Sequence, residues 1–161
     1  MISMVRIDDR LIHGQVAFVW TKHLGVNRII VANDSVAKND IQKMSLKMAV
    51  PDTIKCSILT LDEAINVLND PRGKSLKILI VVNNPADARK IIEKVDDVPY
   101  VNISNYGLLS RDISAKRKVT DTIYATEDDI EEFNKIFKYG KRVEYQVVPT
   151  SPVKSLEGLL K

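Results

Sequence analysis

The residues best suited to chemistry lie in one short segment near the N-terminus. Residues 6–16, RIDDRLIHGQV, contain His13 together with Arg10, Asp8 and Asp9. A neutral imidazole keeps a nitrogen lone pair near pH 7, so it can attack phosphorus and later pass the phosphoryl group on. Arg10, three residues before the histidine, can hold phosphoryl oxygens with its two-pronged guanidinium. These residue types indicate phosphoryl transfer through His13.

The same segment lies where a strand is expected to turn into a helix. Residues 2–7 have the pattern of a strand. After the histidine, side chains recur at helical spacing at Val16, Val19, Trp20 and His23. The first amides of a helix lack internal partners and its dipole is positive there, so a bound anion is stabilised. We therefore expect His13 and Gly14 at this position, with Gly14 in contact with phosphate.

The charged neighbours of the histidine have several possible roles. Asp8 and Asp9 can orient His13 or Arg10, and in the set of site residues we assign this orienting role to Asp9. A carboxylate aimed at a phosphoryl group repels it, so neither aspartate is expected to touch phosphate. Arg6 and Asp8 are two apart on one strand and share a face, which predicts an internal ion pair that fixes the turn. Arg10 has the alternative role of a salt bridge to either aspartate.

A second loop is a candidate contributor to the site. Ser104, Asn105, Tyr106 and Gly107 follow a predicted strand near 99–103 and can offer hydroxyl or amide donors to the same crevice. Among them we select Ser104 as a phosphate contact. His23 shares the apolar stripe of its helix and is expected to have a packing role.

Residues 5–16, VRIDDRLIHGQV, resemble the phosphorylation-site signature of the IIB subunits of the mannose/fructose/sorbose-type bacterial sugar phosphotransferase system (PTS). Weaker similarity continues in four further segments, namely 31–34 (VAND), 43–49 (KMSLKMA), 101–103 (VNI) and 146–149 (QVVP). The resemblance implies a protein-N-phosphohistidine–sugar phosphotransferase. In it, His13 accepts a phosphoryl group on Nδ1 from a IIA phosphohistidine and donates it to a sugar bound by membrane IIC and IID subunits. It implies no cofactor, and the chain has no cluster of metal-ligand residues.

Length and composition limit the class of protein. With 161 residues, 45% of them hydrophobic and 28% charged, the chain is expected to form one domain over 1–161. No apolar run approaches the ~20 residues needed to cross a bilayer. The N-terminus leads directly into a strand without signal-peptide features, so we expect a cytoplasmic protein. The resemblance implies that it associates peripherally with membrane PTS subunits. The single Cys56 excludes an intrachain disulfide and is expected to be a small buried hydrophobe.

The charge pattern gives little support to nucleic-acid binding. The net charge of +3 is mild, although basic residues cluster at Arg111, Lys116, Arg117 and Lys118 and again at Lys138, Lys141 and Arg142. No aromatic residues interleave with the first cluster, as a single-stranded nucleic-acid site would need. The clusters are either a solvated face or a docking rim for phosphorylated or acidic partners.

Apolar strands and amphipathic helices alternate along the chain. Strands are predicted near 2–7, 27–32, 54–59, 76–82, 99–103, 119–124 and 142–148, and helices near 14–23, 36–49, 61–69, 85–95, 126–138 and 153–160. Helix starts are indicated by Asp34, by Thr60 with Glu63, by Pro85 and by Thr126 with Asp129. This predicts an α/β fold, a single doubly wound, mainly parallel sheet of about seven strands with helices on both faces. The resemblance implies strand order 3-2-1-4-5-6-7.

The sequence bears on three rival functions. A receiver-like signalling module would be phosphorylated on an aspartate, and the acidic pair after the first strand suits it. However, the third strand has no aspartate at its end, only Asp62 in the next helix. A nucleotide-binding module would need a P-loop or GxGxxG motif after a strand, and neither occurs. A histidine phosphatase would need Arg-His-Gly, but Ile12 precedes the histidine here.

Overall fold

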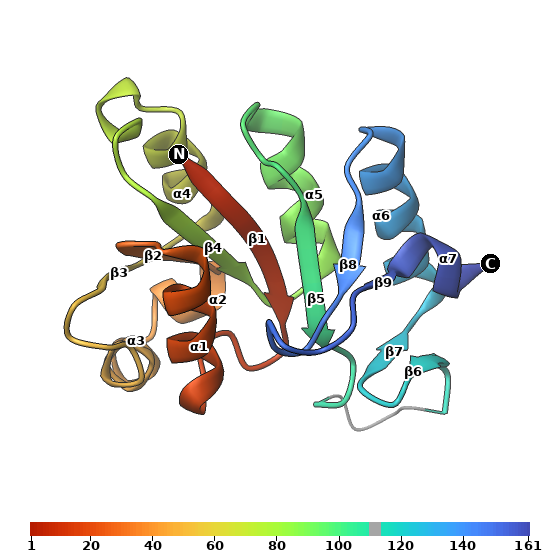
Figure 1. Ribbon diagram of the computed structural model, residues 1–161. Coiled ribbons are helices and arrows are strands. Elements are labelled where there is room, and N and C mark those ends of the chain that lie inside the picture. The colour runs from red at the N-terminus through yellow and green to blue at the C-terminus, as the bar shows by residue number, and fades with distance from the viewer. Residues whose placement is uncertain (110–113) are drawn as a thin grey trace.

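The computed structural model describes residues 1–109 and 114–161, apart from the side chain of Val16. Its main sheet has seven strands in the order β3-β2-β4-β1-β5-β8-β9 (Figure 1). All neighbours in it are parallel except β8 and β9. The strands are β1 (Ile2–Asp8), β2 (Arg28–Ala32), β3 (Lys55–Leu59), β4 (Ile78–Val82), β5 (Val101–Asn105), β8 (Val143–Tyr145) and β9 (Lys154–Ser155). The α/β fold with a mainly parallel sheet is therefore confirmed.

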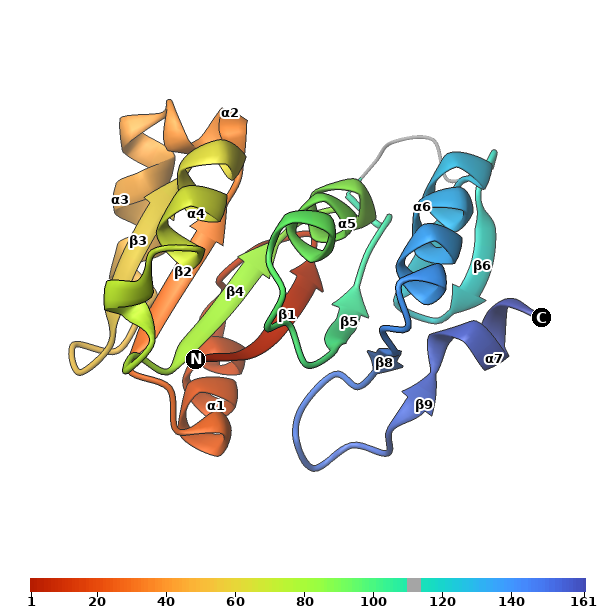
Figure 2. The same cartoon turned by 90° about the horizontal axis from the view of Figure 1, so that it is seen from above.

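Helices cover both faces of this sheet. They are α1 (Gly14–Leu24), α2 (Asp34–Ala37), α3 (Asp40–Met48), α4 (Leu61–Leu68), α5 (Pro85–Lys94), α6 (Glu127–Lys138) and α7 (Leu156–Leu160), with a 3₁₀ turn at Pro71–Gly73. One apolar core contains the buried faces of α4, α5, α6 and α7, and a second contains those of α1 and α2. Seen from above, α1 lies on the opposite side of the sheet from α5 and α6 (Figure 2).

Burial explains why these segments form a parallel sheet. All five residues of β4 are buried, and six of the seven residues of β1 are buried as well. Strands that are covered on both faces must be apolar nearly throughout. The exceptions are Arg6 and Asp8, which are polar and almost fully buried in β1. The core therefore contains charge close to the carboxyl end of its central strand.

Two features of the predicted sheet are wrong. The strand near 76–82 (β4) lies between the first and second strands, whereas the predicted order placed it between the first and fifth. The chain passes from β1 to β2 through α1 on one face of the sheet, and from β4 to β5 through α5 on the other face. Both β1 and β4 are apolar and buried, so their pattern does not distinguish the two positions. The segment 119–124, predicted as one strand of the main sheet, instead belongs to a separate antiparallel hairpin of β6 (Arg117–Thr120) and β7 (Ile123–Ala125). A turn at residues 121–122 separates the two strands.

The helix predicted over 36–49 is two helices. Asn33 accepts a hydrogen bond from the amide of Val36 and begins α2, and Asn39 accepts one from Gln42 and begins α3. Asn33 rather than Asp34 is thus the capping residue, and the Asp34 carboxylate accepts from the amide of Leu61 instead. The predicted starts at 60, 85 and 126 are confirmed, with capping boxes at the first and last. No helix among the described residues is both long and apolar enough to cross a membrane.

Candidate functional site

The turn between β1 and α1 has a tightly specified backbone. The amide of Leu11 donates to the carbonyl of Asp8 over 2.9 Å. Leu11 adopts a positive φ of 61°, which is uncommon for a residue with a side chain, and that side chain is buried in the core beside α1. Gly14 follows with φ 50°, where a Cβ atom would be strained. His13, in extended conformation between them, is the N-cap residue of α1.

The carboxylate of Asp8 is the centre of the site. Its Oδ2 lies 3.2 Å from Nε2 of His13, and its Oδ1 accepts from the backbone amide of Arg10 at 3.1 Å. Asp8 is fully buried, whereas 24% of the His13 side chain is exposed. When Nε2 carries the proton it donates to Asp8, and Nδ1 then keeps its lone pair. In that tautomer Nδ1 is the ring nitrogen with a free lone pair.

A buried network of polar side chains holds the Asp8 carboxylate in place from the protein interior. Arg6 Nη2 donates to Asp8 Oδ2 at 3.0 Å and to Ser104 Oγ at 2.7 Å, and Ser104 Oγ donates to Asp8 Oδ2 at 3.2 Å. Arg6 Nη1 donates to Asn102 Oδ1 at 2.6 Å. Burial lowers the pKa of Arg6, and the charge of Asp8 opposes that effect. The predicted Arg6–Asp8 ion pair is confirmed.

The network is closed by α1 and by the segment after β8. The Arg6 guanidinium carbon lies 5.4 Å from the centroid of the Trp20 ring, and the Trp20 indole N–H donates to the carbonyl of Val147 at 3.0 Å. Asn102 Nδ2 donates to the carbonyl of Gln146 at 3.0 Å. These contacts join residues far apart in the sequence around one buried ion pair. A buried charge is tolerated only with such partners.

The remaining predicted site residues lie at different depths. Arg10 is exposed and, with Asp9, Leu11 and Asn83, lines a hollow of about 250 Å³. Among residues 1–109 and 114–161 no carboxylate forms an ion pair with its guanidinium. Ser104 is 0% exposed, and its hydroxyl is engaged by Arg6 and Asp8. It therefore supports Asp8 and does not face the surface.

Asp9 is not the carboxylate in contact with His13. Its Oδ2 accepts from the amide of Leu108 at 3.1 Å. Burial raises the pKa of Asp9, and the backbone amides of Leu108, Leu109 and Gly107 partly offset this. Asp9 therefore connects the turn to the loop after β5. The orienting role was predicted for Asp9, although the strand alternation that pairs Asp8 with Arg6 could have identified Asp8 as the inward-facing residue.

Other candidate residues have structural contacts. His23 and Trp20 pack edge to face with ring centroids 5.9 Å apart. Cys56 is half-buried, and burial raises the pKa of its thiol to about 11. In the first basic cluster, Arg111 lies outside the described residues, and Lys116 Nζ donates to the carbonyl of Gly107. In the part of the chain that the structure describes, no three His, Cys, Asp or Glu side chains are grouped to hold a metal ion.

Comparison with known proteins gives consistent similarities. The family model described as "PTS system sorbose subfamily IIB component" matches residues 2–161. The chain is 43% identical over 131 residues to a probable phosphotransferase enzyme IIB component of Streptococcus pyogenes, covering 81% of this chain and 80% of that protein. It is 34% identical over 152 residues to the mannose-specific EIIAB component of Escherichia coli K12, covering 94% of this chain but only 46% of that longer protein.

A solved structure has the same fold over nearly its whole length. The IIBSor domain of the sorbose permease from Klebsiella pneumoniae superimposes with a TM-score of 0.92 at 28% identity, covering 99% of this chain and 96% of that one. The agreement covers nearly the whole backbone of both chains, so the two proteins share this fold.

Proposed function

The chain belongs to the sorbose subfamily of PTS IIB components, and on this premise we propose that His13 is the residue that carries the phosphoryl group. IIB components of this family are subunits of sugar phosphotransferase systems. In the proposed reaction His13 accepts the group from a IIA phosphohistidine and donates it to a sugar at the membrane. The observation that carries the proposal is the Asp8 carboxylate at Nε2, 3.2 Å away, which leaves Nδ1 as the nucleophile.

The first transfer forms one P–N bond and breaks another. The Nδ1 lone pair of His13 attacks phosphorus, while the P–N bond of the IIA phosphohistidine breaks and returns its electron pair to the donor ring. Positive charge develops on the His13 ring as the new bond forms. The carboxylate of Asp8, accepting from Nε2–H, stabilises that charge and fixes the ring. In the second transfer the oxygen of a sugar hydroxyl attacks phosphorus and its proton is released to solvent. The electrons of the P–Nδ1 bond return to His13, which is left as the neutral imidazole.

Arg10 and the start of α1 are suited to hold the phosphoryl oxygens. The Arg10 side chain is exposed on the same β1–α1 turn as the histidine, and its backbone amide is fixed by Asp8. A guanidinium stabilises charge spread over several oxygens during in-line transfer. Gly14 is the first residue of α1, where unpartnered amides and the helix dipole favour an anion. In this proposal Ser104 positions the Asp8 carboxylate, and Asp9 positions the turn by accepting a hydrogen bond from the amide of Leu108.

The partners follow from the relay. The Escherichia coli relative is named an EIIAB component, which supports a IIA protein or domain as phosphoryl donor. Transfer to sugar would bring the chain to membrane IIC and IID subunits at the cytoplasmic side. Phosphorylation of an aspartate is disfavoured by the geometry: Asp8 is fully buried against Arg6, and Asp9 is bonded to the loop amides.

Labelling with phosphorylated IIA tests the proposal. The chain should gain one phosphoryl group that survives alkali and is lost in acid, as expected of a phosphoramidate and not of an acyl phosphate. His13→Gln should abolish labelling, because an amide has no nucleophilic lone pair, and His23→Gln should label normally. Electron-transfer fragmentation can locate the group. Label that persists in His13→Gln, or that maps to an aspartate, would overturn the proposal.

A further inference from the structure

The exposed surface of α3 carries an apolar stripe. Ile41, Met44 and Met48 are 82%, 65% and 81% exposed, and their spacing places them along one side of the helix. The opposite side carries Leu46, which packs against the core of α1 and α2. On an ordinary surface helix the outward side is polar. We call these three side chains the α3 ridge.

The α3 ridge adjoins the phosphoryl-transfer turn on two sides. One hollow, of about 250 Å³, is lined by Arg10 and Leu11 together with Gln42, Ser45 and Leu46 of α3. Ser45 is one helical turn from Ile41, so it joins the hollow to the ridge. Both views place α3 at the β3 edge of the sheet (Figures 1 and 2). The ridge is therefore continuous with the surface around Arg10.

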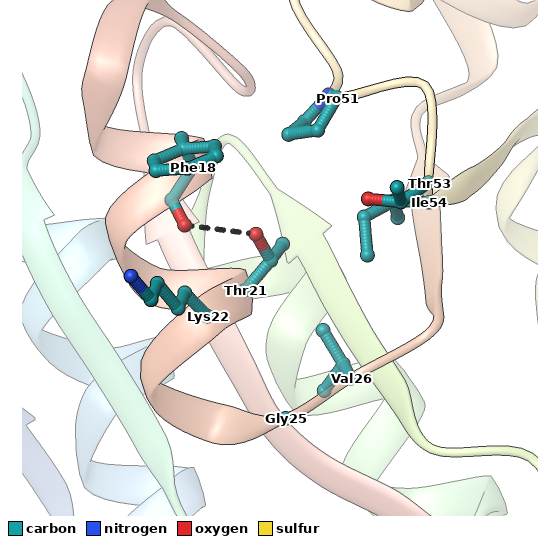
Figure 3. Close-up of a pocket in the computed structure, with 8 residues that line it drawn as sticks. All are labelled: Phe18, Thr21, Lys22, Gly25, Val26, Pro51, Thr53 and Ile54. Carbon is teal, nitrogen blue, oxygen red and sulfur yellow. Dashed lines mark hydrogen bonds between the residues drawn. The ribbon is translucent and has the colours of Figure 1, made fainter.

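On its second side, the ridge is connected to the turn by the surface between the end of α3 and the start of α1. Gly14 and Phe18 line a hollow of about 450 Å³ with Ala49 and Pro51. An adjoining hollow of about 280 Å³ lies between Phe18 and the segment 51–54, as Figure 3 shows. Phe18 is itself 50% exposed. Exposed apolar side chains gathered beside a reactive turn indicate a protein docking surface.

Positive charge accompanies the apolar side chains. Lys47 lies on α3 and is exposed, Lys22 is exposed on α1 beside the adjoining hollow, and Arg10 is exposed at the turn. A partner that approaches this surface should therefore be apolar at its centre and anionic nearby. A phosphorylated protein meets the second condition at its reacting group, whereas a sugar held by a membrane subunit is neutral.

We propose that the α3 ridge is part of the docking surface for phosphorylated IIA, an inference that rests on the proposed function of His13. A donor that binds, transfers its group and leaves needs only a small interface, and three side chains beside the site suit that size. A lipid surface is disfavoured, because stable attachment needs a larger apolar face than three side chains provide.

The test compares two phosphoryl donors on the full chain. Ile41→Asp should lower the second-order rate of transfer from IIA of the same system by about tenfold to a hundredfold. Its labelling by phosphoramidate, a small donor that needs no docking surface, should stay within about twofold of the unchanged protein. Met44→Gln, a milder change, should lower the IIA rate less, and Met44→Leu should retain it.

The matched control lies on another helix. Val67 of α4 is 47% exposed and lines a hollow with Met1 and Ile2, at the opposite end of β1 from His13. Val67→Asp should leave transfer from IIA unchanged. This control separates loss of the ridge from the general effect of a new surface carboxylate.

Each outcome bears on one hypothesis. Normal IIA transfer in Ile41→Asp overturns the docking proposal. If, in addition, transfer from Ile41→Asp to vesicles containing the membrane subunits is lost, the ridge binds those subunits and not IIA. The docking proposal is also overturned if the unchanged protein binds anionic lipid vesicles and Ile41→Asp does not. Failure of both donors to label His13 in the unchanged protein would instead contradict the proposed function. Loss with IIA alone, with Val67→Asp normal, supports the ridge.

Discussion

At the scale of single residues, the site combines a partly exposed histidine, the proposed nucleophile, with a buried carboxylate. His13 reaches the surface, while Asp8 behind it is enclosed by Arg6, Ser104 and the backbone of the turn. A charge that is buried and fully hydrogen-bonded cannot reorient easily, so it fixes the ring that it contacts. The two nitrogens of the imidazole are thereby given different tasks.

Asp8→Asn should impair the chemistry more than its small change in shape suggests. An asparagine amide can donate to Nε2, which would place the ring proton on Nδ1, the attacking nitrogen. By analogy with a catalytic aspartate–histidine pair, labelling should slow by about 10²- to 10⁴-fold. Rapid-quench labelling with phosphoramidate measures the rate, ¹⁵N NMR identifies the tautomer, and circular dichroism checks folding. Asp9→Asn is the matched control and should change the tautomer little. An unchanged tautomer in Asp8→Asn would argue against this role.

Arg10→Ala should slow transfer from phosphorylated IIA by about two to three orders of magnitude while leaving the fold intact, since the side chain is exposed. Arg10→Lys should recover only part of the rate, because an ammonium cannot present a planar fork. Rapid-quench kinetics and a denaturation curve for each variant give the two readouts. A near-normal rate in the alanine variant would remove Arg10 from the mechanism.

Sequence reasoning reached some of these residues and missed others for physical reasons. Strand alternation is local, so it predicted that Arg6 and Asp8 share a face and pair. The contacts of Ser104 and Asn102 with Arg6 span about a hundred residues and depend on β5 lying beside β1. No local pattern shows that the Ser104 hydroxyl faces inward. Asp9 was predicted to orient the histidine, but strand alternation turns Asp8 inward beside Arg6, and it is Asp8 that contacts His13.

At the scale of elements, glycine marks the two loops that meet at the site. Gly14 starts α1 with φ 50°, and Gly107 follows β5 with φ 86°. A Cβ at Gly14 would find no atom within 4 Å, whereas a Cβ at Gly107 would lie 1.9 Å from the carbonyl oxygen of Tyr124. Both glycines therefore have a left-handed backbone, but Gly14 has free space around it, whereas Gly107 is closely packed against Tyr124.

The two glycines give a paired prediction. Gly14→Ala should destabilise the fold by about 1 kcal/mol, the ordinary cost of a left-handed non-glycine residue. Gly107→Ala should cost clearly more, about 2–4 kcal/mol, because the loop must also move away from Tyr124. Urea denaturation of both variants measures the difference. Equal losses would mean that the 107 loop relaxes freely.

Element boundaries were predictable where capping chemistry is local. Thr60 with Glu63 and Thr126 with Asp129 identified two helix starts, and both form reciprocal capping boxes. The break between α2 and α3 was missed, because the helical periodicity of 36–49 outweighed the capping potential of Asn39. The order of β1 and β4 was not predictable from apolarity, since both strands are buried on both faces.

At the scale of the whole molecule, the helices on one face are joined by charge. Arg89 of α5 donates to Glu132 of α6 and to Glu93 within its own helix. The side chains of Arg89 and Glu132 are only 17% and 19% exposed. The pair therefore connects α5 to α6, which pack against each other on the same face of the sheet. Its contribution should be modest but measurable, because partial burial limits screening by water and salt.

This ion pair predicts how stability depends on pH. The hydrogen bond from Arg89 lowers the pKa of Glu132 below its ordinary value of 4.5, and Arg89 likewise lowers the pKa of Glu93. A depressed folded-state pKa means that the unfolded chain binds protons more readily, so the stabilisation is present above 4.5 and is lost as pH falls through the folded-state pKa. Glu132→Gln should thus cost about 0.5–1 kcal/mol at pH 7 and almost nothing near pH 2. Glu131→Gln, which removes an exposed carboxylate from the same helix, should cost little at either pH. Urea denaturation at both pH values gives the comparison, and a Glu132→Gln penalty that persists unchanged in acid would show that packing, not charge, joins α5 to α6.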